Sequence, residues 1–248
     1  MATAKPPLWV WVLLIAAIFG VSSAGTLLQQ IELDPLLKAS WRLQLTAVVL
    51  FPFALVQWRQ QPSEVKAQMF EKRTLAILAL SGLALALHFG AWVASLKYTT
   101  LTHSLLFVTA HPLIVVAGMF ILGIVLTGVR QPTHRELVGA MIGFAGAAMT
   151  LLDEGTQQGD NTVTLLGDSL ALLGAFTVVG YIVCGRILRA WMPIFLYAFP
   201  VTLLAAVLLL PASMLVENDF ARYGVVGWLD AAFFGWFLAL ALIAGLLG

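Results

Sequence analysis

The chain has 248 residues, of which 61% are hydrophobic and 10% are charged, and its formal net charge is +1. A soluble domain carries about 25% charged residues, so this composition excludes an ordinary soluble globular domain. The near-zero net charge also leaves no basic field for nucleic acid. The apolar residues fall into blocks of roughly 20 residues, which is typical of a multi-pass α-helical membrane protein. The single cysteine, Cys184, excludes an internal disulfide.

The first apolar block predicts a membrane helix over residues 8–29. An alternative interpretation is a cleavable signal peptide, because Lys5 precedes the block and small residues follow at 22–24. Against cleavage, the apolar run continues to Leu28 and is long enough to span a bilayer. Cleavage would leave seven spans and an external N-terminus.

A second helix is predicted over residues 36–58, with Pro52 bending it. Arg42 is the only arginine well inside an apolar block. Its side chain either snorkels to the lipid headgroups or contacts a substrate or gate, and the sequence leaves both open. Residues 59–73 are polar and net basic, and we expect a solvated connector.

The third predicted helix covers residues 74–96 and has polar side chains on one face. His88 and Trp92 lie on this face at helical spacing. Ionisable side chains inside a membrane are costly and usually face a bundle interior or a cavity. His88 is therefore a candidate cavity residue, and a hydrogen bond to a neighbouring helix is the alternative.

The fourth predicted helix covers residues 100–124 and contains His103, His111 and Pro112. Pro112 removes one backbone hydrogen bond and frees the carbonyl of Val108. A free carbonyl beside the His111 imidazole can bind a substrate or a proton, and an imidazole titrates near neutral pH. The alternative for each histidine is a hydrogen bond within the bundle. We expect no metal site, because neither this helix nor the preceding one contains a carboxylate or a cysteine to complete a ligand set.

The next helix is predicted over residues 136–152. Its three glycines lie nearly on one face and indicate close helix packing: Gly139, Gly143 and Gly146. The loop at 153–166 is acidic and contains no lysine or arginine, so we expect it to separate two halves of the chain.

Three further helices are predicted in the second half. The helix over residues 167–188 places Tyr181 on the same side as Thr177 and Cys184. The helix over residues 193–216 is expected to break near its two prolines, and an acidic connector follows. A last apolar run begins at residue 231 and continues to the final residue.

Lysine and arginine placement predicts the topology. One set of alternate loops, together with the N-terminus, holds nine of the thirteen Lys and Arg residues and three of the twelve acids. We therefore expect a cytoplasmic N-terminus and eight crossings, in a plasma or inner membrane or an organelle membrane.

Two segments of the chain resemble each other. LIAAIFGVSSAG is followed by prolines 17 residues apart, and LLGAFTVVGYIV by prolines 18 residues apart. This internal similarity predicts two repeats of five helices, the first over residues 1–152 and the second an incomplete copy over residues 167–248. An odd number of helices inverts the second copy, and inverted repeats are usual in secondary transporters.

These features resemble the drug/metabolite transporter superfamily, EamA type. The resemblance lies in the following residues, in order: Trp41-Arg42, the turn Lys97-Tyr98-Thr99-Thr100, Pro112, the three glycines at 139–146, Gly167-Asp168, Leu172-Leu173 and Tyr181. It implies an all-α bundle of ten helices in two inverted repeats, with both chain ends cytoplasmic. It also implies transport of small metabolites such as amino acids, while relatives carry nucleotide sugars or sugar phosphates.

Carried over by position, the resemblance implies a set of residues in or near the central cavity: Arg42, Trp92, Tyr98, His111 and Pro112. Two features depart from the family. The family usually has a glutamate at the end of the fourth helix, and this chain has Thr127 and Gly128 in that region. The last two helices of the family are also missing, so we expect the chain to be a fragment.

The sequence therefore favours a secondary transporter of a small polar, amino-acid-like metabolite that works by alternating access. Proton coupling and a homodimer are left open. The second hypothesis is a seven-helix receptor produced by signal cleavage. We expect no enzyme activity and no cofactor, because no HExxH, GxSxG or paired carboxylates lie in a helix. The candidate substrate-binding or cavity-lining residues are Arg42, His88, Trp92, Tyr98, His111, Pro112 and Tyr181.

Overall fold

The computed structural model describes residues 7–125, 131–149 and 163–247, and every regular element within these ranges is a helix. The chain forms two compact units. Unit 1 consists of residues 1–75 and 191–248, and unit 2 consists of residues 76–190. Each unit therefore contains helices from both sides of the predicted boundary at 153–166. The division into two sequence repeats stays a prediction.

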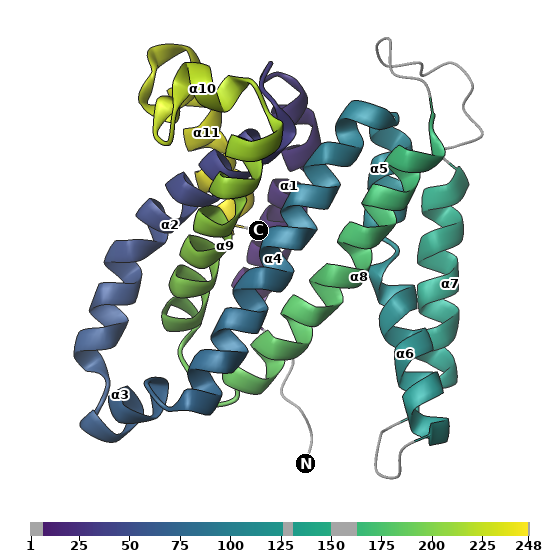
Figure 1. Cartoon of the computed structure of the whole chain (residues 1–248). Coiled ribbons are helices and arrows are strands. Elements are labelled where there is room, and N and C mark those ends of the chain that lie inside the picture. Colours follow the sequence, from purple (N-terminus) through teal and green to yellow (C-terminus); the bar gives the residue numbers. More distant parts are fainter. Residues whose placement is uncertain (1–6, 126–130, 150–162, 248) are drawn as a thin grey trace. The chain divides into compact units, whose positions relative to one another are not determined.

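Unit 1 is built from two long helices, a peripheral first helix and several short elements (Figure 1). In chain order these are α1 (Leu8–Gln29), α2 (Pro35–Gln60), α3 (Ser63–Met69), α9 (Ile194–Val216), α10 (Asp219–Tyr223), η2 (Gly227–Leu229), α11 (Ala231–Ala239) and the π-helix η3 (Leu240–Leu247).

The core of unit 1 lies between α2 and α9, which pack along each other. The Ser40 hydroxyl donates to the carbonyl oxygen of Ala206 at 2.8 Å, and Ala205 and Ala206 are fully buried. Small side chains at this contact allow the two backbones to approach closely. The π-helix η3 packs on α1 and α2. There, a Cβ added to Gly245 would lie 2.7 Å from Oγ1 of Thr46.

A reciprocal set of hydrogen bonds joins the start of α2 to the end of α9. Glu217 accepts from the backbone N–H groups of Leu36 at 2.6 Å and Leu37 at 2.9 Å. Asp219 accepts from the N–H of Asp34 at 2.7 Å, and Asp34 accepts from the N–H of Asp219 at 3.2 Å. The first N–H groups of a helix have no partner inside the helix. Carboxylates from a distant segment therefore cap α2.

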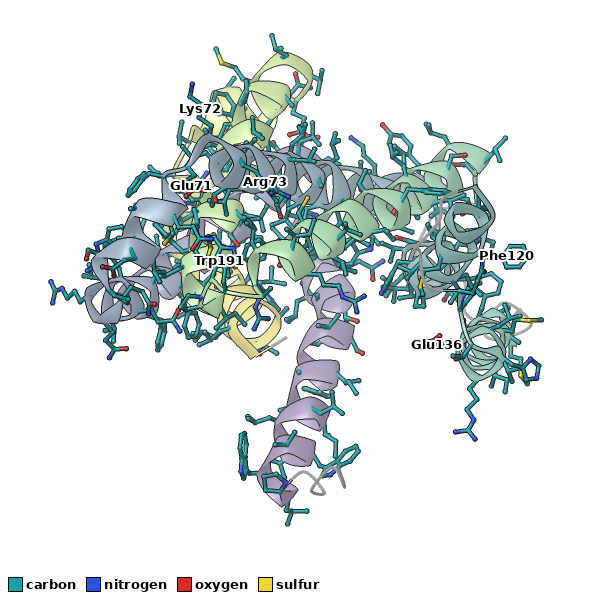
Figure 2. All side chains as sticks on the ribbon, turned by 90° about the horizontal axis from the view of Figure 1, so that it is seen from below. Glu71, Lys72, Arg73, Phe120, Glu136 and Trp191 are labelled. Carbon is teal, nitrogen blue, oxygen red and sulfur yellow. The ribbon has the colours of Figure 1, made fainter. Side chains whose placement is uncertain are left out.

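Unit 2 contains most of α4 (Lys72–Tyr98), then α5 (Leu101–Val108), α6 (His111–Val125), α7 (His134–Met149) and α8 (Leu165–Leu188). The first residues of α4 belong to unit 1, and Figure 2 shows Glu71, Lys72 and Arg73 together at the junction with α3. Within unit 2, α5 packs on α8, while α6 packs on both α7 and α8.

Two predictions about helix boundaries are wrong. The predicted helix over 100–124 is two helices, because α5 ends at Val108 and α6 begins at His111, directly before Pro112. Conversely, α9 is continuous through Pro200 and Pro211, which are tolerated inside it. The two predicted connectors also contain the short helices α3 and α10.

Six helices among the described residues are long and apolar enough to cross a membrane, whereas eight were predicted. These six spans are Leu8–Gln29, Pro35–Gln60, Lys72–Tyr98, Leu101–Ile121, Leu165–Leu188 and Ile194–Val216, and the fourth of them combines α5 with most of α6. The last predicted helix is shorter, at Ala231–Leu246. The remaining predicted helix corresponds to α7, which has 16 residues and begins with His, Arg and Glu.

Many apolar side chains on these helices are exposed, as a lipid-facing surface requires. In α6, Phe120 is 55% exposed (Figure 2). The first helix, α1, exposes most of its apolar side chains. Residues 153–162 of the predicted acidic loop, and Thr127 and Gly128, lie outside the described residues.

Candidate functional site

In unit 1, a buried arginine lies in the third turn of α2. Arg42 is 5% exposed, and the preceding Trp41 is fully buried. The Trp41 ring makes edge contacts with Tyr223 at 6.3 Å and Phe237 at 5.7 Å between ring centroids. A guanidinium is always charged, so its burial in an apolar helix is costly and indicates a specific role.

Residues next to Arg42 in α2 contact the segment between α10 and α11. The indole Nε1 of Trp228 donates to Oε1 of Gln44 at 2.9 Å, and Nε2 of Gln44 donates to the carbonyl of Val225 at 3.1 Å. A Cβ at Gly227 would lie 2.5 Å from the Trp41 ring, so the backbone there rests directly on the indole. This segment therefore has a fixed position over the first half of α2.

In unit 2, His88 joins α4 to α8. Its Nδ1 donates to the carbonyl oxygen of Gly174 at 2.9 Å, and its ring stacks on Trp92 with centroids 6.2 Å apart. The structure thus brings together two of the candidate residues. The hydrogen bond is the structural alternative that the sequence analysis kept open for His88.

A second polar cluster in unit 2 was not predicted as a site. Asp168, one turn into α8, accepts a hydrogen bond from the Thr99 hydroxyl at 2.8 Å. Its other carboxylate oxygen lies 3.2 Å from Nδ1 of His103 in α5. Thr99 is fully buried, and the two titratable side chains are partly exposed, 25% for His103 and 17% for Asp168.

The break between α5 and α6 places an imidazole beside the carbonyl that Pro112 leaves without its helical partner. Nδ1 of His111 lies 3.3 Å from the carbonyl oxygen of Val108. This hydrogen bond is the structural alternative that the sequence left open for His111. Whether His111 binds a substrate or a proton stays a prediction.

The remaining candidates lie elsewhere in unit 2. Tyr98, at the end of α4, is 40% exposed, and its carbonyl accepts a hydrogen bond from the Thr164 hydroxyl. Tyr181 is half-buried in α8. Arg42 belongs to unit 1, and the other six candidates belong to unit 2. Their cavity-lining role stays a prediction.

Within the described ranges, no group of three or more His, Cys, Asp or Glu side chains gathers in a way that could hold a metal ion. His88 and His111 are hydrogen-bonded to carbonyl oxygens, and His103 is paired with Asp168.

Sequence reasoning missed two polar contacts of these sites. Asp168 was noted only as part of the opening of a helix, and Gln44 was not singled out. Each has its partner far along the chain, 65 residues away for His103 and 184 for Trp228. The available signal was a polar side chain within the first turns of an apolar helix.

Apolar helices of spanning length, lipid-compatible surfaces and buried polar side chains define an integral, multi-pass α-helical membrane protein. Residues 7–152, more than half of the chain, match the EamA-like transporter family. The chain belongs to this family, which is a family of membrane transporters within the drug/metabolite transporter superfamily. No curated protein and no solved structure matches the chain.

Proposed function

We propose that this protein is a secondary transporter of a small polar metabolite of the amino-acid type. It works by alternating access, with its N-terminus in the cytoplasm. Membership of a transporter family supports a carrier over a seven-helix receptor. The observation that carries the proposal within this family is the buried cation in α2.

Arg42 supports a substrate with an anionic group. A snorkelling arginine would extend to the surface, whereas Arg42 is only 5% exposed. The guanidinium fork binds a carboxylate through two parallel hydrogen bonds, a geometry that lysine does not reproduce. A free amino acid carries such a carboxylate. We therefore propose that Arg42 binds the substrate carboxylate.

Uptake of individual radiolabelled amino acids into proteoliposomes tests this role. We expect Arg42→Ala to raise the apparent KM at least about tenfold, since a hydrogen bond to a charged group contributes about 1.5–3 kcal/mol. Arg42→Lys keeps the charge, so its apparent KM should lie between that of Arg42→Ala and that of the unchanged protein. Arg59→Ala is the matched control, because Arg59 is exposed at the end of the same helix.

An unchanged apparent KM in both Arg42 variants would refute the contact with the substrate. Absence of uptake and exchange of every amino acid by the unchanged protein would refute the substrate class. We propose further that uptake is coupled to protons, because three histidines lie in the apolar helices of unit 2.

A further inference from the structure

Polar contacts join the connection between α4 and α5 to the start of α8 in unit 2. The Thr164 hydroxyl donates to the carbonyl of Tyr98, and the Thr99 hydroxyl donates to Asp168 at 2.8 Å. A Cβ at Gly167 would lie 2.6 Å from the Tyr98 carbonyl, so the two backbones touch. Because of these contacts, Asp168 has a fixed position, and its helix α8 packs on α5 (Figure 1).

The geometry of this region defines how His103 is protonated. A carboxylate only accepts hydrogen bonds, so Nδ1 of His103 carries the hydrogen that it donates to Asp168 at 3.2 Å. In the neutral ring, Nε2 then has the free lone pair. The imidazole is 25% exposed, and His103 is the third residue of α5, at the end of a membrane span, where the aqueous phase is near.

We infer that the His103–Asp168 pair, oriented by Thr99, is the site that binds the coupling proton; this inference rests on the proposed transport function. With a neutral imidazole the pair carries one negative charge. A proton taken up from water at Nε2 gives an imidazolium–carboxylate pair with no net charge. The same proton leaves from Nε2 when the transporter opens to the other side.

This change in charge explains how proton binding drives the transport cycle. Enclosing an unbalanced charge in a low-dielectric interior is costly, whereas a neutral ion pair costs much less. The helices around the pair can therefore close readily only after the proton has bound. Because Asp168 is in α8 and His103 is in α5, the proton acts directly on the contact between these two helices.

The other titratable groups near the pair do not replace Asp168. Lys97 and Tyr98 lie at the end of α4 and are exposed. The helix α7, which also packs on α5, carries His134, Arg135 and Glu136 in its first turn, at the end remote from α5 (Figure 1). In α6, His111 is the alternative proton acceptor and must be tested beside His103.

The experiment compares exchange with gradient-driven accumulation in proteoliposomes that contain the full chain. The probe is a pool of radiolabelled amino acids. Exchange at equal pH needs no net proton movement. Accumulation driven by an inside-alkaline pH gradient does need it, because protons enter together with the solute. At one proton per solute, a gradient of one pH unit supports about tenfold accumulation.

We expect both His103→Gln and Asp168→Asn to lose accumulation, so that the inside and outside concentrations become equal. Asp168→Asn leaves no charge to enclose and should keep exchange, which shows that this variant is folded. His103→Gln leaves the Asp168 charge unbalanced and should also slow exchange. Asp168→Glu keeps the carboxylate and should retain part of the accumulation. His134→Gln is the control, because His134 is an exposed histidine outside the pair, and it should behave like the unchanged protein.

Full accumulation by both His103→Gln and Asp168→Asn would overturn the inference, and so would loss of coupling in His111→Gln alone. Exchange by the unchanged protein without any response to the pH gradient would overturn the inference but leave the carrier intact. Absence of both activities would refute the carrier of amino acids and this inference together.

Discussion

At the scale of single residues, Gly167 determines how closely α8 approaches α4. An ideal Cβ at this position would lie 2.6 Å from Cβ of Thr99 and from the Tyr98 carbonyl. Gly180, in the same helix, has its nearest contact at 3.6 Å, an ordinary van der Waals distance. The two glycines therefore have different tolerance for a methyl group.

We expect Gly167→Ala to lower the free energy of unfolding by about 1–3 kcal/mol, because an added methyl group forces the backbones of α8 and α4 apart. Gly180→Ala should be neutral or stabilising, since alanine is the better helix former. Thermal unfolding of both variants in detergent measures the difference. Equal melting temperatures would show that the contact at Gly167 relaxes without cost.

At the scale of secondary-structure elements, the start of α2 depends on α9. Glu217 accepts from two N–H groups of α2 and also from the Ser213 hydroxyl at 2.6 Å. Such caps contribute about 1 kcal/mol each. The helix that carries Arg42 is therefore held at its first turn by a carboxylate from the other long helix of unit 1.

Replacing this carboxylate should loosen the first turn of α2. We expect Glu217→Ala to speed hydrogen exchange at the amides of Leu36 and Leu37 by about 5–30-fold, which corresponds to one or two kcal/mol. Glu217→Gln keeps one acceptor oxygen and should have a smaller effect. Glu71→Ala is the control, because Glu71 is exposed at the junction of α3 and α4 (Figure 2). Unchanged exchange at both amides would contradict the capping role.

The sequence was informative wherever the controlling interaction is local. The bounds of α1 were predicted correctly, because its apolar block ends at Gln29. The effect of Pro112 on the Val108 carbonyl was also predicted, since proline acts four residues back along its own helix. The end of α5 at Val108 was not predicted, because the tertiary contacts of α5 and α6 determine where the helix stops.

The polar contacts between helices could not be predicted. His103 and Asp168 are each ordinary residues at a helix start, and only packing of α5 on α8 makes them a pair. In the same way, nothing local indicates that Glu217 caps α2. Composition and spacing identified the membrane helices, whereas the partners of their polar side chains depend on the tertiary fold.

At the scale of the whole molecule, charge placement predicts which loops face the cytoplasm. In unit 1, Ser63 follows the end of α2, and Asn218 lies beside its start, where the Asn218 N–H donates to Asp34 at 3.0 Å. Both residues are exposed. They are therefore suitable reporters for the two sides of the membrane.

We expect Ser63→Cys to react with a membrane-impermeant maleimide only after the cells are permeabilised, and Asn218→Cys to react in intact cells. The native Cys184, which is buried, is first replaced by serine so that it adds no signal. The reverse labelling pattern would show that the N-terminus faces outward. Equal labelling of both positions would contradict the crossing of α2.

Unit 1 is formed by two separate stretches of the chain, residues 1–75 and 191–248, which the ribosome makes at different times. Glu217 is separated by 181 residues from Leu36, which it caps. At a synthesis rate of about 5–20 residues per second, the ribosome needs about 9–36 s to cover that distance. During this interval α2 is present in the cell without its cap and without α9, while all of unit 2 is being made. The nascent chain is then most exposed to chaperones and membrane proteases, so a ribosome that stalls before residue 217 leaves a product that quality control can recognise.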